Sequence, residues 1–192
     1  MLAILLGYLT GSVPFAYLLA RRAGVDVRVA GSGNVGAANV LRTAGALRGV
    51  LVMALDVTKG ITAVAIAYRL SGSAALAAVT GAAAVVGHIY PVWLKFHGGK
   101  GVAVAAGVFS MLSPTATAIA AVLFLVTVWI TRYVSLGSIA ASLALPPAIW
   151  LTGEPRAEVI AAAGTAALIL FRHRGNWRRL RSGTERRMGA RA

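Results

Sequence analysis

The sequence predicts an all-α protein, a polytopic bundle of about seven transmembrane helices with its N-terminus outside and its C-terminus in the cytoplasm. The 192 residues are 58% hydrophobic and only 12% charged, and their mean hydropathy is +0.78, which is typical of membrane proteins. Apolar segments of about 20 residues, the length that crosses a bilayer, recur along the chain. Basic residues gather on one side of these segments, as the positive-inside rule requires of cytoplasmic loops.

Six segments are long enough to cross a bilayer, and a seventh is shorter. The long candidates are residues 2–20, 46–70, 72–93, 114–131, 134–152 and 156–171. The apolar stretch 101–112 rises only about 18 Å at about 1.5 Å per residue, so it is a short span or half of a re-entrant hairpin turning at Ser113-Pro114. No basic region precedes the first segment and Arg21-Arg22 follow it, which indicates a first span with its N-terminus outside rather than a cleaved signal peptide.

Basic residues place two loops, one turn and the tail on the cytoplasmic side. With the N-terminus outside, loops 21–45 and 94–100, the turn at Arg132 and a basic tail at about 172–192 all face inward. The net charge of +14 also suggests nucleic acid, but the basic residues flank apolar segments, where membrane topology and anionic lipid explain them better. We therefore expect membrane lipid, and no nucleic acid, as a partner.

The composition and the spacing of reactive side chains exclude several kinds of site. Because the chain has no cysteine, it forms no disulfide, thiolate metal site or cysteine nucleophile. His88 and His97 lack a metal-ligand spacing, so no metal is expected. Neither a Ser-His-Asp order nor a G-x-S-x-G elbow is present, so an acyl-enzyme has no recognisable nucleophile. No cofactor is indicated.

A glycine-rich loop, GSGNVG at residues 31–36, is the first of three polar motifs in this apolar sequence. Glycines free backbone N–H groups to face an anion, and Arg42 can grip a phosphate with two parallel hydrogen bonds. The loop also fits a dinucleotide fingerprint with Asp56 20 residues after its last glycine, but Asp56 lies in an apolar run and no strand–helix–strand unit is available. A flexible turn between helices is the alternative. The candidate phosphate-binding residues are Gly33, Asn34, Gly36, Asn39 and Arg42.

Residues Gly98, Gly99, Lys100 and Gly101 form the second polar motif. It is not a Walker A loop, because Gly101 rather than Ser or Thr follows Lys100. The motif does open an apolar helix, so free N–H groups and the positive end of the helix dipole would face a bound anion. All four residues are therefore candidates for substrate binding. The alternative is a flexible turn that anchors the loop on the cytoplasmic side.

His173 and Asn176 form the third motif, just past the last apolar segment. Their i, i+3 spacing puts them on one helix face if the helix continues, where they are candidate catalytic residues, with His173 as either a general base or an orienting group. The alternative is an ordinary basic segment that leaves the membrane. Asp56 and Lys59 also lie three residues apart on a face of an apolar segment, where charges are costly unless they are paired or face a polar cavity. They form either a structural ion pair or a support for the site, and His88 is expected to form hydrogen bonds near the cytoplasmic end of a span.

In five stretches the sequence resembles the bacterial integral-membrane glycerol-3-phosphate acyltransferases that use acyl phosphate as donor. The stretches run in the expected order over nearly the whole chain: GSGNVGAANVLRTAG (31–45), DVTKG (56–60), GHIYPVWLKFHGGKGVA (87–103), SLGSIAA (135–141) and RHRGNWRRL (172–180). Val35 and Ala38 stand where the family usually has Pro and Thr, which removes one hydroxyl donor beside the phosphate loop. Two tail residues also differ from the usual pattern, whereas His173 and Asn176 remain.

The resemblance implies a seven-helix fold and a single acyltransferase domain over residues 1–192, in the bacterial cytoplasmic (inner) membrane with its active site facing the cytoplasm. It implies transfer of an acyl group from acyl phosphate to the 1-hydroxyl of glycerol 3-phosphate, giving lysophosphatidic acid and phosphate for phospholipid synthesis. The glycine loop with Asn39 would hold the donor phosphate, and a soluble enzyme that produces acyl phosphate is a candidate partner. The residues that the resemblance places in the substrate site are Ser32, Arg42, Lys100, Ser138, His173 and Asn176.

A transporter of a small organic phosphate is the main alternative, since it would also need basic residues and broken helices near the membrane. However, the charged motifs all lie at one face, with little polar lining toward the other, which favours an enzyme. A structural protein that binds anionic lipid would explain the arginine-rich tail but not His173 or the glycines. Because an acyl phosphate is already activated, an enzyme needs only to bring two anions together and stabilise the developing oxyanion.

Overall fold

Every regular element that the structure describes is a helix, which confirms the predicted all-α class. The structure is a computed structural model that describes residues 1–189. A short 3-10 turn, η1 (Val92–Leu94), precedes α6. The α-helices are α1 (Leu2–Ser12), α2 (Phe15–Arg21), α3 (Ala37–Thr43), α4 (Ala46–Ser71), α5 (Ala74–Ile89), α6 (Val102–Leu112), α7 (Pro114–Thr131), α8 (Val134–Leu151), α9 (Arg156–Arg172) and α10 (Arg174–Arg181).

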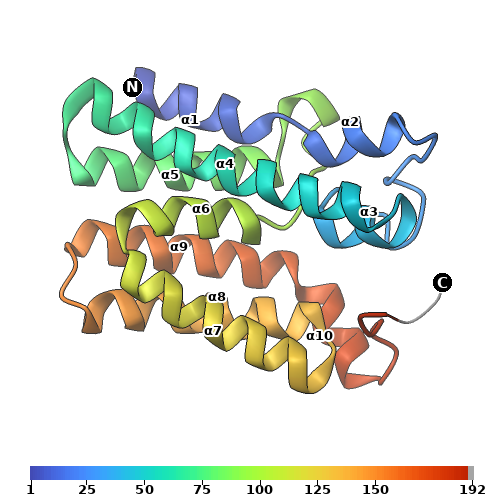
Figure 1. Cartoon of the computed structure of the whole chain (residues 1–192). Helices are drawn as coiled ribbons and strands as arrows, with labels where there is room; N and C mark the ends of the chain where they lie inside the picture. Colours follow the sequence, from blue (N-terminus) through green and yellow to red (C-terminus); the bar gives the residue numbers. More distant parts are fainter. Residues whose placement is uncertain (190–192) are drawn as a thin grey trace.

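The long helices pack side by side in one bundle (Figure 1). α1 lies on α5, α4 lies on α5 and α6, and α9 joins this group to the pair α7 and α8. Glycines let the backbones approach closely, because a Cβ on Gly11 would overlap the Ala84 carbonyl of α5, and a Cβ on Gly107 would overlap the Val57 carbonyl of α4. The abundant small residues of the sequence therefore serve the packing between helices.

Within residues 1–189, five helical segments are long and apolar enough to cross a membrane, by length and composition. They are Leu2–Arg21, Ala46–Ser71, Ala74–Leu94, Pro114–Thr131 and Val134–Leu151. The shorter apolar helices α6 and α9 have 11 and 17 residues. Together these helices coincide with the seven apolar segments read from the sequence, to within a few residues at each end.

Prolines account for two differences from the predicted helices. The segment 2–20 is not one helix, because Pro14 has no backbone N–H and separates α1 from α2. α5 ends at Ile89, shortly before Pro91, since the residue before a proline disfavours the helical conformation. The break at Pro14 and the short helices α3 and α10 give the described residues ten α-helices in place of the predicted number of about seven.

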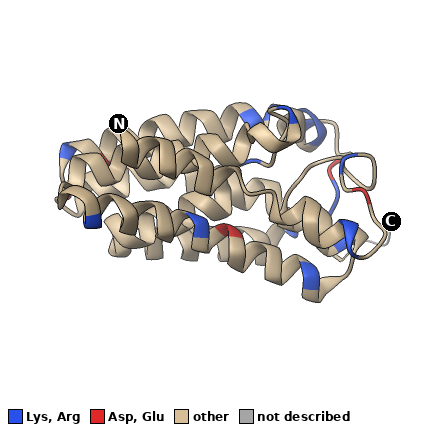
Figure 2. Ribbon diagram, turned by 90° about the horizontal axis from the view of Figure 1, so that it is seen from above, with Lys and Arg blue, Asp and Glu red and all other residues tan. Residues whose placement is uncertain are grey.

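Charged residues are distributed unevenly along the bundle axis. Most Lys and Arg positions lie toward the end of the bundle where the C-terminus lies (Figure 2). The short helices α3 and α10 and the loop between α5 and α6 lie at this same end (Figure 1). α6, at about 1.5 Å per residue, is much shorter than its neighbour α7, so the loop that precedes α6 lies deeper in the bundle than the turn that follows α7.

Candidate active site

The three polar motifs of the sequence meet at the basic end of the bundle. The glycine loop before α3 touches the loop before α6, because a Cβ on Gly99 would lie 2.7 Å from the Val35 carbonyl oxygen. The loop before α6 in turn contacts the segment after α9, since the Lys100 ammonium donates a hydrogen bond to the Asn176 amide oxygen. Segments that lie far apart in the sequence therefore build one site.

Asn39 organises the glycine loop from its buried position in α3. Its amide nitrogen donates to the carbonyls of Val27 and Ala30, both at 3.0 Å, and its amide oxygen accepts from the Ser32 backbone N–H at 2.9 Å. Both amide hydrogens are therefore used within the protein. We expected Asn39 to help hold a phosphate, whereas its contacts in the structure shape the loop that exposes Ser32 and Gly33.

The glycines at 31 and 33 are required by the backbone of this loop. Gly31 and Gly33 have φ angles of 63° and 70°, in the left-handed region that favours glycine. A Cβ on Gly31 would also overlap the Asn39 amide oxygen. The amides of Gly33 and Gly36 are bonded within the loop, to the carbonyls of Ala30 and Asn34 at 3.1 Å each. Glycine is therefore needed at positions 31 and 33 for the backbone conformation of the loop, more than for a supply of free N–H groups.

The loop before α6 is held by the end of α5. The N–H groups of Gly98 and Gly99 donate to the carbonyls of Ile89 and His88, at 3.0 and 3.2 Å. These two amides therefore do not face a ligand as expected, because each already has an acceptor inside the protein. Gly101 has a φ of 89° and is the N-cap of α6. Lys100, the cation of this motif, therefore extends from a turn whose backbone is held on both sides.

A carboxylate from the C-terminal tail completes the cluster around Lys100. The Asn176 amide nitrogen donates to the Glu185 carboxylate at 2.7 Å. Ser135 of α8 donates to the same carboxylate oxygen at 2.9 Å, and the Arg179 guanidinium pairs with the other oxygen at 2.7 Å. Asn176 is thus oriented by Glu185 on one side and holds the Lys100 ammonium on the other.

Cations outnumber anions in this cluster. Burial lowers the pKa of Lys100 to about 8; the Glu185 carboxylate opposes this shift, while the positive charges of Arg179, Arg172 and Arg42 add to it. Burial also lowers the pKa of Arg42. Four cations therefore surround a single carboxylate, and such an arrangement strongly favours the binding of an additional anion.

His173 is buried at the junction between α9 and α10, with an exposed fraction of 2%. Its Nδ1 lies 2.8 Å from the Ile169 carbonyl oxygen, and since a carbonyl can only accept, Nδ1 carries the proton and Nε2 carries the lone pair. Burial and the positive charge of Lys100 lower the pKa of His173 to about 4. The imidazole is therefore neutral at pH 7.

The third motif does not lie on one continuous helix, as its spacing would allow. α9 ends at Arg172 and α10 begins at Arg174, with His173 between them in a non-helical conformation. The Arg172 guanidinium donates to the Gly98 carbonyl at 3.2 Å. The helix break therefore turns His173 inward and lets Arg172 hold the loop that carries Lys100.

Two candidate serines occupy different settings. Ser32 is exposed in the glycine loop. Ser138 is buried in α8, and its hydroxyl donates to the Val134 carbonyl of the same helix at 2.9 Å. Ser135, one turn earlier on α8, is the serine whose hydroxyl contacts the polar cluster.

Sequence reasoning missed Glu185 and the neighbouring Arg179. A signal for Glu185 was present, because it is the single acidic residue after Glu158 in a segment rich in arginine. An isolated carboxylate among cations is expected to pair with them. Its partners Asn176 and Ser135 could not be identified from spacing, because 9 and 50 residues separate them from Glu185 in the chain.

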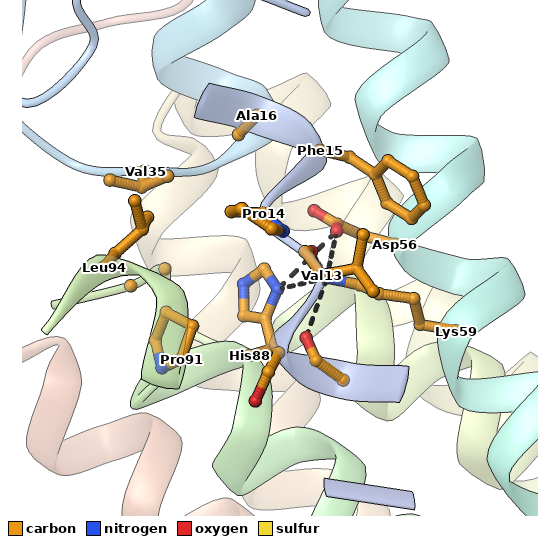
Figure 3. Close-up of a pocket in the computed structure, with 14 residues that line it drawn as sticks. Val13, Pro14, Phe15, Ala16, Val35, Asp56, Lys59, His88, Pro91 and Leu94 are labelled. Carbon is orange, nitrogen blue, oxygen red and sulfur yellow. Dashed lines mark hydrogen bonds and ion pairs between the residues drawn. The ribbon is translucent and has the colours of Figure 1, made fainter. Parts of the chain in front are cut away.

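The predicted ion pair between Asp56 and Lys59 is present in a second polar cluster, behind the loop before α6. The Lys59 ammonium lies 2.7 Å from an Asp56 carboxylate oxygen and 3.1 Å from Nδ1 of His88, as Figure 3 shows. Among residues 1–189 there is no group of three or more His, Cys, Asp or Glu side chains that could hold a metal ion.

Comparisons with known proteins give one consistent result. Residues 1–183 match the model of a family described as glycerol-3-phosphate acyltransferase. The glycerol-3-phosphate acyltransferase of Geotalea daltonii is 47% identical over 178 residues, covering 93% of this chain and 92% of the relative. That of Myxococcus xanthus is 48% identical over 186 residues, covering 96% and 97%.

A solved structure agrees with these relatives. The chain is similar to the crystal structure of PlsY, an integral membrane glycerol 3-phosphate acyltransferase, in its glycerol 3-phosphate form. The TM-score is 0.94 at 42% sequence identity, covering 98% of this chain and 94% of that chain. The form of PlsY with lysophosphatidic acid gives a TM-score of 0.91 at 41% identity.

Proposed function

The chain belongs to the glycerol-3-phosphate acyltransferase family of integral membrane enzymes, and we propose that it transfers an acyl group from acyl phosphate to the 1-hydroxyl of glycerol 3-phosphate. The products are lysophosphatidic acid and inorganic phosphate, and the reaction serves phospholipid synthesis. The observation that carries the proposal is the cluster in which three arginines gather around Lys100, beside the buried and neutral His173. Two phosphate-bearing substrates need this excess of positive charge, and the attacking hydroxyl needs a proton acceptor.

The whole chain acts as one acyltransferase domain with a basic tail in the cytoplasm. Its seven crossing segments are α1 with α2, then α4, α5, α6, α7, α8 and α9. The N-terminus lies outside, and the basic end of the bundle (Figure 2) faces the cytoplasm of a bacterium across its inner membrane. The positive-inside rule supports this orientation, and the acyl chain of the donor enters between helices from the bilayer.

The reaction is a direct transfer. The hydroxyl oxygen of glycerol 3-phosphate attacks the carbonyl carbon of the acyl phosphate, and the bond from that carbon to the phosphate oxygen breaks. Nε2 of His173 takes the hydroxyl proton, and inorganic phosphate leaves. The mixed anhydride is activated before it binds, so no covalent acyl-enzyme is needed.

The remaining groups bind and orient the two anions. Arg42 and Lys100 neutralise phosphate charge, and Asn176 holds the Lys100 ammonium in position. The glycine loop with Asn34, held in shape by Asn39, receives the donor phosphate, while Ser32 and Ser138 orient the acceptor. Gly98, Gly99 and Gly101 give the Lys100 loop its shape. A soluble enzyme that makes acyl phosphate supplies the donor.

Transport of a small organic phosphate is the competing function. It would require polar groups along a path to the other end of the bundle, whereas the polar motifs gather at one end. Purified protein is mixed with acyl phosphate and labelled glycerol 3-phosphate, and lysophosphatidic acid is the expected labelled product. Uptake of the label into sealed vesicles without this product would support the transporter and contradict the enzyme.

A further inference from the structure

Three buried polar side chains lie directly behind the loop that carries Lys100. Asp56 and Lys59 come from α4 and His88 from α5, and their exposed fractions are 2%, 4% and 8%. The Lys59 ammonium contacts both the Asp56 carboxylate, at 2.7 Å, and Nδ1 of His88, at 3.1 Å. Burying such charges is costly unless they are paired.

Lys59 also ties down the break between α1 and α2. Its ammonium donates to the carbonyls of Gly11 and Val13, at 3.1 and 3.0 Å. The carbonyls at the end of a helix lack intrahelical partners, and Pro14 cannot supply an N–H to them. A cation at the C-terminus of α1 meets this need and also complements the helix dipole.

His88 connects the charge pair to the Lys100 loop. Its carbonyl accepts the Gly99 N–H at 3.2 Å, and its ring fills the space beside Gly99, where an added Cβ would lie 2.9 Å from Cε1 of His88. The second ring nitrogen, Nε2, points away from the charge pair (Figure 3) and lies against Gly99, where an added Cβ would overlap it. A movement of the His88 ring would therefore displace Gly99, which is one residue before Lys100.

The cavity beside the cluster is too small for either substrate. Asp56, Lys59 and His88 line it together with Gly99 and residues of the α1–α2 break, and its volume is about 10 Å³. That is room for about one water molecule. The three side chains consequently act on the reaction through the loop and do not touch the reacting groups.

We propose that Asp56, Lys59 and His88 form a positioning cluster that fixes the Lys100 loop against the α1–α2 break, and so sets where the Lys100 ammonium meets substrate phosphate. This inference rests on the proposed function. The cluster joins the end of α1, the middle of α4 and the end of α5. These three parts meet directly behind the loop that carries Lys100.

The test removes both charges together. Removing one partner of a buried ion pair strongly destabilises a protein, because the other charge is left uncompensated. The double variant Asp56→Asn, Lys59→Met avoids this effect, since it removes both charges. We expect kcat/KM per folded molecule to fall about tenfold, and hydrogen exchange of the Gly98 and Gly99 amides to become faster. His88→Ala, which keeps the charge pair, is the second variant and should change both quantities in the same direction.

The matched control lies at the opposite end of the bundle. Glu158 of α9 is buried and accepts a hydrogen bond from Ser113 at 2.6 Å, so Glu158→Gln also disturbs a buried polar contact. It should lower the midpoint of thermal unfolding while kcat/KM stays within about twofold and exchange at Gly98 and Gly99 stays unchanged.

Three results would overturn the positioning role. They are normal kcat/KM in both test variants, lost activity without faster exchange at the two glycines, and equal kinetic loss in Glu158→Gln. An unaltered protein that makes no lysophosphatidic acid would instead contradict the proposed function. Unchanged activity in the variants of an active enzyme contradicts the positioning role alone.

Discussion

Lys100 and Asn176 are joined by a hydrogen bond from the lysine ammonium to the asparagine amide oxygen, across 76 residues of sequence. The contact links the loop before α6 to the segment that follows the last apolar helix. Because Asn176 is itself held by Glu185, the position of the ammonium depends on three parts of the chain. The placement of the Lys100 ammonium is therefore a property of the assembled bundle, and no single motif determines it.

Replacing Lys100 or Arg42 by alanine should weaken the use of both substrates. Each change removes charge-assisted contacts of about 1.5–3 kcal/mol, which corresponds to a loss of at least about tenfold in kcat/KM. Steady-state kinetics with purified variants measure the loss. Near-normal kinetics for Lys100→Ala would contradict a role in phosphate binding and would leave the loop before α6 as a turn that anchors the chain on the cytoplasmic side.

Activity should decline as the pH rises through about 8. The pKa of Lys100 is lowered to about 8, so the ammonium is charged below that pH and neutral above it. A profile of log kcat/KM against pH from 6 to 10 would show this decline as its alkaline limb. Lys100→Arg keeps the charge throughout this range, so a limb that persists in this variant would assign the titration to another group.

Glu185→Gln should move the same limb to lower pH. The Glu185 carboxylate raises the pKa of Lys100, so its neutralisation removes support for the charged ammonium. The shift is read from the pH profile, which makes it separable from any loss of stability. Glu154→Gln, remote from the site, serves as the control. An unmoved limb in Glu185→Gln would mean that the carboxylate does not act on Lys100.

His173→Ala should depress kcat more than it alters the KM for glycerol 3-phosphate. The imidazole is neutral because its pKa is lowered to about 4, and the proton transfer proposed for it belongs to the reaction step. No activity loss near pH 6.5 is expected from this group. Enzyme quenched with labelled acyl phosphate alone should carry no covalent label, and stoichiometric label on Ser32 or His173 would replace direct transfer with a two-step mechanism.

Cysteines introduced singly at Arg28, Lys95 and Arg181 should react only with reagents added from the cytoplasmic side. The chain has no cysteine of its own, so the background is clean. All three positions lie in basic segments next to the site, and basic loops are retained in the cytoplasm. Periplasmic labelling at any one of them would contradict the proposed orientation.

The sequence predicted the apolar helices well because hydropathy reports directly on burial in lipid. It did not predict the separation of α1 from α2, since the apolar pattern continues through Pro14 and only the backbone changes there. The spacing of Asp56 and Lys59 predicted their pairing, because neighbours on a helix face must meet. Their bonds to the end of α1 follow from packing between helices, which spacing does not encode.

The sequence identified the three polar motifs, and the structure brings them together, whereas substrate binding by their residues stays a prediction. Glycines and cations marked the loops, and the Lys100 cluster brings the second and third motifs together. Asn39 shows the limit of such reasoning, because an amide beside glycines suits a phosphate and a loop equally well, and only its three hydrogen bonds distinguish these uses. Nothing in the sequence indicated that Glu185 would also meet Ser135, which lies 50 residues away on another helix.

The location of His173, Asn176 and Glu185 after α9 has a consequence for biosynthesis. A membrane protein is inserted as it is made, from its N-terminus onward. The loops before α3 and α6 are therefore in place while His173 and the groups that orient Lys100 are still to be translated. On the proposed mechanism, nascent chains arrested before His173 should be inserted in the membrane but inactive.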